Sequence, residues 1–391
     1  MLGIAGYSTV HAAGVDNTDS WHAIASGRSG LKPNALTWCD LPCWVGEVAG
    51  VDTTPLPAEL TVWDCRSHRL AWMALQRNGF RQAVAGAVAR HGADRVGVVL
   101  GSSTAGIRST ELAYQRRRED GHWPADFDYR RSHSLDALCR FSAEVLALRG
   151  PMVAISTACS SSSKVFLTAQ RWIECGLVDA AVVGGADSLC LSTLHGFNAL
   201  QLLASNACRP FDAARDGISI GEAAGFVLLD RQPAPINFVG GGESSDAWHM
   251  STPHPEGRGA QSAMRGALAA AGLTARDIGY VNAHGTATLA NDRAEAMATC
   301  AVFGACAVPV SSTKCVTGHT LGAAGITEAI VAIQALEQQV LPPSANLREL
   351  ASDLAIDAVT QPRSTHLHHA MSNNFGFGGS NCSLIFGRAD G

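Results

Sequence analysis

Residues 154–176 read AISTACSSSSKVFLTAQRWIECG: a short apolar run, a turn rich in Ser, Thr and Cys, and then a helical pattern. Residues 309–336, PVSSTKCVTGHTLGAAGITEAIVAIQAL, repeat this order later in the chain. Two glycine-bearing segments, 221–230 and 376–387, also match each other, because each ends in a short apolar run. Such an internal echo predicts a duplicated fold. We expect the halves to span 1–235 and 236–391, with RQPAP at 231–235 as their connector.

Short strand-like runs alternate with helix-like segments along the rest of the chain. Strands are expected at 1–10, 96–101, 152–157, 180–186, 225–230, 278–285, 308–314 and 381–387. Helices are expected at roughly 66–91, 135–149, 160–175, 258–272, 292–303 and 322–338. This alternation predicts an α/β protein with largely buried sheets.

The composition argues against several classes of protein. Of 391 residues, 47% are apolar, so disorder is not expected, and a net charge of −5 disfavours general nucleic-acid binding. No apolar run is long enough to span a membrane. Twelve cysteines without a CxxC pair, together with an opening stretch that lacks a basic start, predict a reduced, cytoplasmic protein. The excess of glycine, 40 residues, predicts many sites of positive φ or close backbone approach.

Cys159 is the first candidate for chemistry, because it lies where an apolar strand gives way to a helix. The dipole and free amides of a helix N-terminus stabilise a thiolate, and the same amides can hold a developing oxyanion. A nucleophilic cysteine needs this environment. Taken alone, the residue fits an inert buried cysteine equally well.

Two later segments carry candidate acid–base residues. His284 ends an apolar run in VNAHGTAT, residues 281–288, where a core histidine is the alternative. Lys314 and His319 share a tight turn within 311–325, where an exposed lysine and a capping histidine are the alternatives. A lysine between an apolar strand and a small-residue helix is costly unless it is paired or used. Glu328, nine residues after His319, is a plausible partner for Lys314.

A glycine-rich loop is expected at 372–381, SNNFGFGGSN, where Phe375 and Phe377 alternate with glycines. Such a loop lets backbone amides approach a reacting group and can hinge a phenylalanine gate, although a structural turn is the alternative. The segment is not a dinucleotide-binding motif, because the spacing differs and a strand follows instead of a helix.

Two further patterns are interpreted as structural. GISIG at 217–221 matches G-x-S-x-G, but Ser219 is not between a strand and a helix as a nucleophile elbow requires. His366, His368 and His369 have no cysteine or carboxylate nearby in sequence, so a solvated loop is favoured over a metal site. No metal is expected in this chain.

Together, TACSSS, NAHGTAT, SSTK…TGH…GAAG and FGFGGSN appear in an order that resembles the β-ketoacyl-acyl-carrier-protein synthases. GGADSL at 184–189, RPFDAARDG at 209–217 and SSDAWHM at 244–250 fit the same family. The resemblance implies a thiolase fold: two similar halves, each a five-stranded sheet with helices, stacked in five layers, α-β-α-β-α. It also implies a dimer with the active site near the interface.

The resemblance assigns roles residue by residue. Cys159 would accept an acyl group from a carrier-protein thioester, and His284 and His319 would promote decarboxylation of malonyl carrier protein. Lys314 with Glu328 would order the site. Other implied roles are the oxyanion hole (amides of Cys159 and Phe377), the gate (Phe377), the phosphopantetheine contacts (Thr286 and Thr288) and further substrate contacts (Phe197, Phe375 and Thr104). No separate cofactor is implied, since the carrier protein brings the phosphopantetheine.

Three departures from the family pattern bear on the pathway. Leu289 stands where proline is common, Thr104 stands where a bulky apolar residue is common, and the connector at 231–235 is short. The stretch 196–212, GFNALQLLASNACRPFD, resembles the shorter synthases of aryl-polyene and related polyketide-like pathways. Carrier proteins are acidic, so a basic rim is expected; the candidates are Arg66, Arg69, Arg116, Arg117, Arg118, Arg130 and Arg131.

Alternatives to a homodimeric synthase stay open. The chain could be the catalytic half of a heterodimer with a chain-length-factor subunit, whereas a non-catalytic factor typically lacks the cysteine kept here at 159. A degradative thiolase-type acyltransferase would need a second cysteine in the glycine-rich loop, but Cys382 lies beyond it. A priming synthase of type III pairs its histidine with asparagine, where this chain has His319.

Overall fold

The computed structural model describes residues 1–117 and 121–389, so Arg118 lies outside the described residues. The N-terminal half of its main sheet consists of β1 (Leu2–His11), β4 (Val96–Gly101), β5 (Met152–Ile155), β6 (Ala180–Asp187) and β8 (Ala223–Asp230). The C-terminal half consists of β9 (Ile236–Ser245), β10 (Tyr280–Asn282), β11 (Pro309–Ser311), β13 (Asp357–Ala358), β15 (His369–Gly376) and β16 (Ser380–Arg388). Within the described residues these strands form one sheet in the order β13-β11-β10-β15-β16-β9-β1-β8-β6-β4-β5.

The two halves of this sheet are built alike. In the first, β4 is parallel to both β5 and β6, and β8 is antiparallel to β6 and β1. In the second, β10 is parallel to both β11 and β15, and β16 is antiparallel to β15 and β9. The halves meet where β1 and β9 pair over Leu2–Phe238 and Gly3–Asn237. Residues 231–235 lie between β8 and β9.

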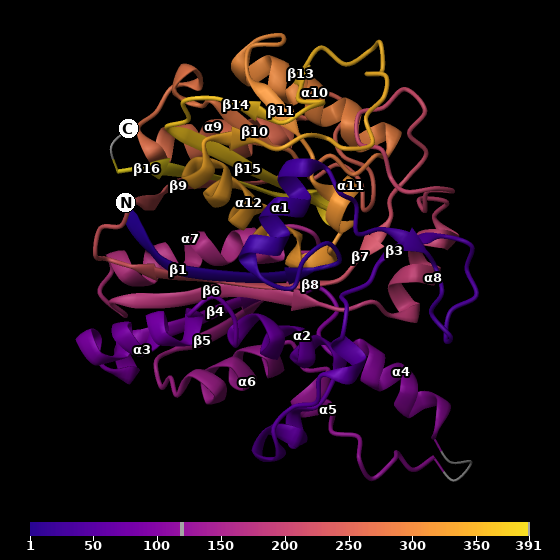
Figure 1. Ribbon diagram of the computed structural model, residues 1–391, viewed down its shortest axis with the longest axis vertical. Helices are drawn as coiled ribbons and strands as arrows, with labels where there is room; N and C mark the ends of the chain where they lie inside the picture. Colours follow the sequence, from indigo (N-terminus) through magenta and orange to yellow (C-terminus); the bar gives the residue numbers. More distant parts are fainter. Residues whose placement is uncertain (118–120, 390–391) are drawn as a thin grey trace.

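Helices complete five layers (Figure 1). The central layer is α7 (Ser161–Glu174) and α12 (Ala324–Gln338), between the two halves of the sheet. One outer layer holds α2 (Arg66–Leu75), α3 (Phe80–His91) and α6 (Ala137–Leu146), and the other holds α9 (Arg258–Ala271) and α10 (Leu289–Phe303). α12 is buried from Ala324 through Leu336, as a helix enclosed on all sides must be. The predicted α-β-α-β-α order is confirmed.

Shorter elements surround these layers. The remaining helices are α1 (Asn17–Ser26), α4 (Ile107–Gln115), α5 (Tyr129–Ser132), α8 (Leu191–Ala199) and α11 (Lys314–Thr317). Small sheets join β2 (Lys32–Pro33), β3 (Trp44–Gly46) and β7 (Ile220–Gly221), and β12 (Val340–Leu341) with β14 (Arg363–Ser364). 3-10 turns lie at Val51–Thr53, Ala58–Trp63, Ala93–Arg95, Ala275–Asp277, Leu321–Ala323 and Phe377–Gly379.

Three expectations for local structure are wrong. The helix expected at 66–91 is two helices, because Asn78 (φ 57°) and Gly79 (φ 69°) adopt left-handed conformations that end one and start the next. The strand expected at 308–314 ends at Ser311, and α11 begins at Lys314. The expected glycine-rich loop at 372–381 is a hairpin: β15 runs to Gly376, and only Phe377–Gly379 form a turn before β16.

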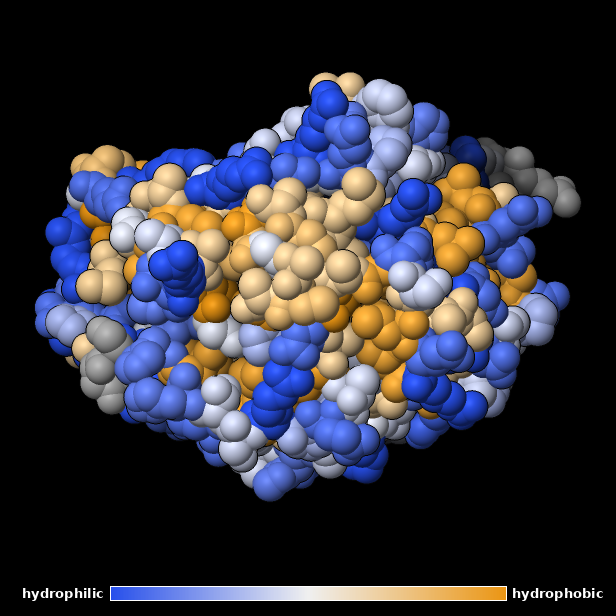
Figure 2. All heavy atoms as spheres, turned by 90° about the horizontal axis from the view of Figure 1, so that it is seen from above, coloured by the Kyte–Doolittle hydropathy of each residue, from blue (hydrophilic) through white to orange (hydrophobic). Residues whose placement is uncertain are grey.

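The sequence reading also missed β9, whose Gly240–Gly242 run has low strand propensity. Packing explains the glycines, because a Cβ added to Gly242 would lie 2.2 Å from the Ala263 carbonyl oxygen of α9. The alanine-rich helix α9 therefore lies close to β9, and α10 packs beside α9. Seen from their side, the surface is apolar in the middle and ringed by polar residues (Figure 2).

Within residues 1–117 and 121–389, no helix combines the length and the apolar character needed to cross a membrane.

Candidate active site

Cys159 lies in the turn between β5 and α7, two residues before the helix begins. Ala158 takes a left-handed conformation, with φ of 52°, which reverses the chain just before the cysteine. The serines that follow satisfy the turn's own backbone: Ser160 Oγ donates to the Thr157 carbonyl (2.9 Å), and Ser161 Oγ to the Ala158 carbonyl (2.6 Å). This local bonding leaves the Cys159 thiol buried, at the start of a central helix.

The electrostatics of Cys159 differ from the simple expectation for a helix N-terminus. Burial raises the pKa of its thiol to about 11, while the Phe377 backbone N–H and the Lys314 ammonium lower this pKa by smaller amounts. Desolvation therefore outweighs the groups that favour the thiolate. The Cys159 thiol needs a nearby base to ionise at neutral pH.

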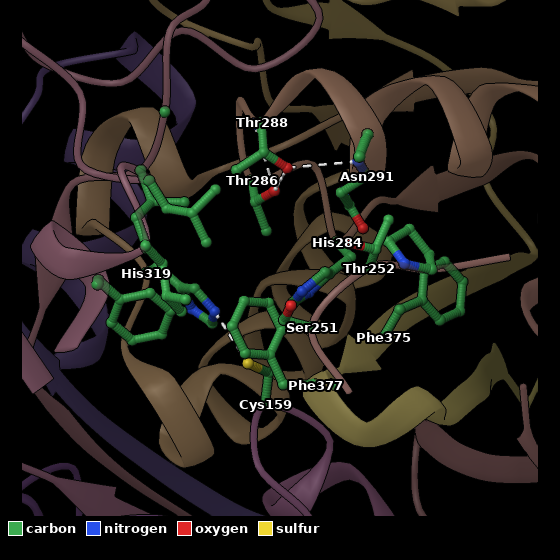
Figure 3. A pocket seen from close by; sticks show the side chains of 18 of the residues that line it. Cys159, Ser251, Thr252, His284, Thr286, Thr288, Asn291, His319, Phe375 and Phe377 are labelled. Carbon is green, nitrogen blue, oxygen red and sulfur yellow. Dashed lines mark hydrogen bonds between the residues drawn. The ribbon is translucent and has the colours of Figure 1, made fainter. Parts of the chain in front are cut away.

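Two histidines from different connections converge on this thiol (Figure 3). His319, between α11 and α12, places Nε2 3.1 Å from Cys159 Sγ. His284, which follows β10, has its ring centroid 5.3 Å from that of His319, at an interplanar angle of 87°. Burial and the Lys314 charge lower the pKa of both imidazoles well below the usual value, so both rings are neutral at physiological pH.

Lys314 and Glu328 form a buried ion pair behind the histidines, as their sequence context suggested. Lys314 Nζ also donates to the His284 carbonyl oxygen (2.5 Å) and lies 3.3 Å from His284 Nδ1. Glu328 in turn accepts a hydrogen bond of 2.6 Å from Asn374 Nδ2. An ammonium beside Nδ1 makes that nitrogen an acceptor, which leaves the proton of neutral His284 on Nε2.

Glu295 of α10 holds the His284 backbone, and sequence reasoning missed it. Its carboxylate accepts the backbone N–H groups of His284 (2.8 Å) and Gly285 (2.7 Å). Asp292, one turn earlier, accepts the N–H groups of Phe211 (2.7 Å) and Ala287 (3.1 Å). Burial raises the pKa of Glu295 to about 7 and that of Asp292 to about 6. The available signal was two acids three residues apart on an alanine-rich helix.

Cys159, His284 and His319 line the inner end of a cavity of about 370 Å³. Of the predicted substrate contacts, Phe197, Phe375, Thr286 and Thr288 also line it, as does Phe377. The rings of Phe197 and Phe377 lie 5.5 Å apart, and Thr286 and Thr288 share a hydrogen bond of 3.0 Å. Ser251, Thr252 and Asn291 are among the polar residues of the wall that were not predicted as site residues (Figure 3).

Thr104 is not among the residues that line this cavity, and its expected substrate contact stays a prediction. Its hydroxyl and its backbone N–H both donate to the buried carboxylate of Asp187, at 2.7 and 2.9 Å. Ser219, set aside above, is buried and accepts the Cys208 N–H (3.0 Å). Arg66 is not a rim residue either, because its guanidinium is buried in an ion pair with Glu222 (2.7 Å).

The other basic-rim candidates within the described residues are at least partly exposed, although several already have partners. Arg69 pairs with Asp64 (2.6 Å), and Arg116 pairs with Asp126 (2.9 Å). A rim residue that is already paired must exchange partners to bind an acidic protein. The assignment of rim residues to carrier-protein docking stays a prediction.

Cys159, His284 and His319 also form the one metal-type donor cluster found within the described residues, with donor atoms no more than 4.8 Å apart. A thiolate and two imidazoles are ligands that zinc accepts. The Lys314 ammonium, 3.3 Å from His284 Nδ1, places positive charge directly behind this cluster and opposes a cation there. The donor set is more favourable for proton transfer than for holding a divalent ion.

Known proteins resemble the chain over almost its whole length. Residues 66–234 match the β-ketoacyl synthase N-terminal domain, and residues 237–348 match its C-terminal domain. Nodulation protein E of Rhizobium meliloti (strain 1021) is 36% identical, with 98% of each chain covered. 3-Oxoacyl-[acyl-carrier-protein] synthase 2 of Vibrio cholerae serotype O1 is 38% identical, with 76% of each chain covered.

A solved structure agrees with these relatives. It is a ketosynthase in complex with its chain length factor, from Xenorhabdus doucetiae. The matching chain is 39% identical to this one and superposes on it with a TM-score of 0.92. The match covers 99% of this chain and 98% of that chain. The protein thus belongs to the β-ketoacyl synthase family and is a condensing acyltransferase with the thiolase fold.

Proposed function

We propose that this condensing enzyme extends acyl chains on an acyl carrier protein by decarboxylative condensation with malonyl carrier protein. The observation that carries the proposal is the 3.1 Å separation of Cys159 Sγ and His319 Nε2, beside neutral His284, at the inner end of one cavity.

In the first step the Cys159 thiol gives its proton to His319 Nε2, and the sulfur attacks the carbonyl carbon of the acyl thioester. The bond from that carbon to Cys159 forms, the bond to the carrier sulfur breaks, and the proton goes to the leaving thiolate. The Phe377 N–H, directed at the cysteine, is placed to stabilise the oxyanion. Because this step starts from a thiol whose pKa is about 11, it depends on His319 as base.

In the second step the malonyl group loses CO2, and the resulting enolate carbon attacks the acyl carbon on Cys159. A carbon–carbon bond forms, and the bond to the Cys159 sulfur breaks. His284 offers its Nε2–H to the enolate oxygen. His319 Nδ1 has no hydrogen-bond partner in the described part of the chain, so its proton is free to sit on either ring nitrogen. The same ring therefore accepts a proton in the first step and donates a hydrogen bond to the enolate oxygen in the second. The Cys159 thiolate released in the second step takes up one proton from solvent, which restores the thiol.

We propose a second subunit, either another copy or a chain-length-factor-like partner. Support comes from the 39% identity to a chain of the ketosynthase–chain length factor complex, and from β5, an edge strand of the sheet whose Met152 is 41% exposed. The aromatic wall formed by Phe197, Phe375 and Phe377 favours conjugated or aryl primers, as in aryl-polyene or polyketide-like pathways. All twelve cysteines are free, which supports a cytoplasmic location.

A thiolase-type acyltransferase is disfavoured. Cys382, the cysteine nearest the turn in sequence, is fully buried within β16 and does not line the cavity. Burial also raises the pKa of this thiol strongly. Cys382 therefore makes a matched control for Cys159.

The test is mass spectrometry of carrier-bound products from malonyl carrier protein and a panel of acyl and aryl primers, with and without a candidate partner subunit. We expect a β-ketoacyl product and CO2 from the wild type and from Cys382→Ala, and no product from Cys159→Ala. Full condensation by Cys159→Ala would overturn the mechanism. Loss in Cys382→Ala with the fold retained would favour the thiolase alternative.

A further inference from the structure

Asp187 is a buried carboxylate at the C-terminal end of β6 that collects hydrogen bonds from two distant segments. The hydroxyls of three consecutive residues after β4 donate to it: Ser102 (2.6 Å), Ser103 (2.8 Å) and Thr104 (2.7 Å). The backbone N–H groups of Ser103 (3.0 Å), Thr104 (2.9 Å) and Gly322 (2.6 Å) donate as well. No ion pair to Asp187 occurs in the described ranges, so hydrogen bonds alone stabilise this charge there.

The segments tied by Asp187 lie next to the two sides of the active site. Ser102 donates its backbone N–H to the Ile155 carbonyl (3.2 Å), at the end of β5 where the Cys159 turn begins. Gly322 is three residues after His319, in the 3-10 turn that leads into α12. One carboxylate thus connects the base of the Cys159 turn to the turn that carries His319.

The contact between Asp187 and the His319 turn leaves no spare room. A Cβ on Gly322 would lie 2.6 Å from Asp187 Oδ2 and 2.6 Å from the Ser103 nitrogen. Leu321, just before it, holds a left-handed φ of 55°, which costs energy for a residue with a side chain. Such a conformation persists only where the surrounding structure constrains it. The hydrogen bond from the Gly322 N–H to Asp187 constrains the residue that follows Leu321.

We propose that Asp187 is a positioning residue that sets the Cys159–His319 separation by holding the His319 turn against the Ser102–Thr104 loop. This inference rests on the proposed function for its effect on turnover. It also gives the hydroxyl of Thr104 a structural role, because this hydroxyl donates to Asp187. An apolar residue at position 104 would remove one of the three hydroxyl donors to the carboxylate.

Asp187 also has an electrostatic effect, because its negative charge raises the pKa of Cys159. Three charged groups influence the Cys159 pKa: Lys314 lowers it, and Asp187 and Glu328 raise it. Removal of the Asp187 charge should therefore make Cys159 ionise at lower pH, a change that loss of packing alone would not produce.

The test is Asp187→Asn in the full-length enzyme, because asparagine keeps the shape and one acceptor but removes the charge. We expect kcat for condensation to fall about 100-fold, with a smaller change in KM, since misplacement of catalytic groups by about 1 Å has effects of this size. The pH midpoint for alkylation of Cys159, read by peptide mass spectrometry, should move downward. The matched control is Asp230→Asn, because Asp230 is also fully buried. Asp230 ends β8 and lies opposite Ala180, the first residue of β6, whereas Asp187 is the last residue of β6.

Three results would overturn the proposal: wild-type kcat in Asp187→Asn, an equal loss of kcat in Asp230→Asn, or an unmoved alkylation midpoint. If Asp187→Asn does not fold, Ser103→Ala combined with Thr104→Val removes two donors and keeps the carboxylate. This variant should lose about tenfold in kcat, and full activity would again refute positioning. If the wild type itself does not condense, the proposed function fails, while the alkylation midpoint still reports on Asp187 and Cys159.

Discussion

The turn from β5 to α7 and the turn from β11 to α12 occupy matching places in the two halves, yet they differ in length and in the way their polar groups bond. The first spans residues 156–160 and leads directly into a helix. The second spans residues 312–323 and contains α11 and a 3-10 turn before α12 begins. Each precedes one of the two central helices, so both turns face the same interior.

The short turn bonds to itself, whereas the long turn bonds to other elements. Ser160 and Ser161 donate to carbonyls three residues earlier, which leaves the Cys159 sulfur as the group presented to the cavity. In the long turn, Lys314 reaches the His284 carbonyl and Glu328. The duplicated scaffold thus presents the Cys159 thiol from the first turn, and the longer second turn brings Lys314 and His319 close to it.

The largest expected effect separates the chemistry of the two turns. Cys159→Ala should lower condensation at least about 10³-fold, because no other thiol lies beside His319 in the cavity. This variant should still release CO2 from malonyl carrier protein, whereas His319→Ala should block that release. CO2 release and product mass spectrometry measure both reactions. Equal loss of CO2 release in both variants would show that decarboxylation depends on Cys159 as much as on His319.

The next effect concerns the two lysines near these turns. Lys314→Met should destabilise the fold by about 3–5 kcal/mol, because Glu328 stays buried without its counter-charge. Lys164→Met on α7 should cost about 1 kcal/mol or less, because its partner Glu243 is more exposed. Chemical denaturation measures both losses. Lys314→Met with Glu328→Leu should recover stability, and equal losses for the two single variants would contradict the comparison.

A third effect is the pH dependence of the short turn. The pKa of Cys159 rises from an ordinary 9.0 to about 11 in the fold, so its alkylation in the native protein should approach a midpoint near pH 11. Because the folded pKa is above the unfolded one, this thiol contributes up to about 3 kcal/mol of stability below pH 9.0, and the contribution is lost as the pH rises towards 11. The denatured protein provides the control. A native midpoint below that of the denatured chain would mean that the helix N-terminus outweighs burial.

The smallest effect tests the contact between the two central helices. A Cβ on Gly325 of α12 would lie 2.2 Å from Ser163 Oγ of α7, so Gly325→Ala should cost about 1–3 kcal/mol through overpacking. Gly266 of α9 is the matched helical glycine, because a Cβ there meets only the Gly242 Cα at 3.4 Å. Gly266→Ala should be neutral or mildly stabilising in thermal denaturation. An equal loss of stability in both variants would show that α7 and α12 pack less tightly than the 2.2 Å approach to Ser163 Oγ indicates.

Much of the fold and of the active site could be predicted from the sequence, because both depend on local pattern. The strand–turn–helix segments around Cys159 and Lys314 are readable from apolar periodicity and turn residues. β9 was missed because its three glycines have low strand propensity. The close approach of α9 that requires Gly240 and Gly242 comes from residues that lie later in the chain, such as Ala271 and Ala263. Glu295 was missed because it accepts the backbone N–H of His284. Every residue except proline has such an N–H group, so the sequence does not show which one a carboxylate will bind.

The duplicated α/β architecture and the residue types around Cys159 could be inferred from the amino-acid sequence, since hydrophobic period and motif order are properties of the chain. Which polar groups meet could not be inferred without the folded structure: Thr104 donates to Asp187, Arg66 pairs with Glu222, and the pKa of Cys159 is raised. Burial and hydrogen-bond partners depend on segments far apart in sequence. Burial raises the pKa of the Cys159 thiol, and the thiol is buried only once those segments have packed together.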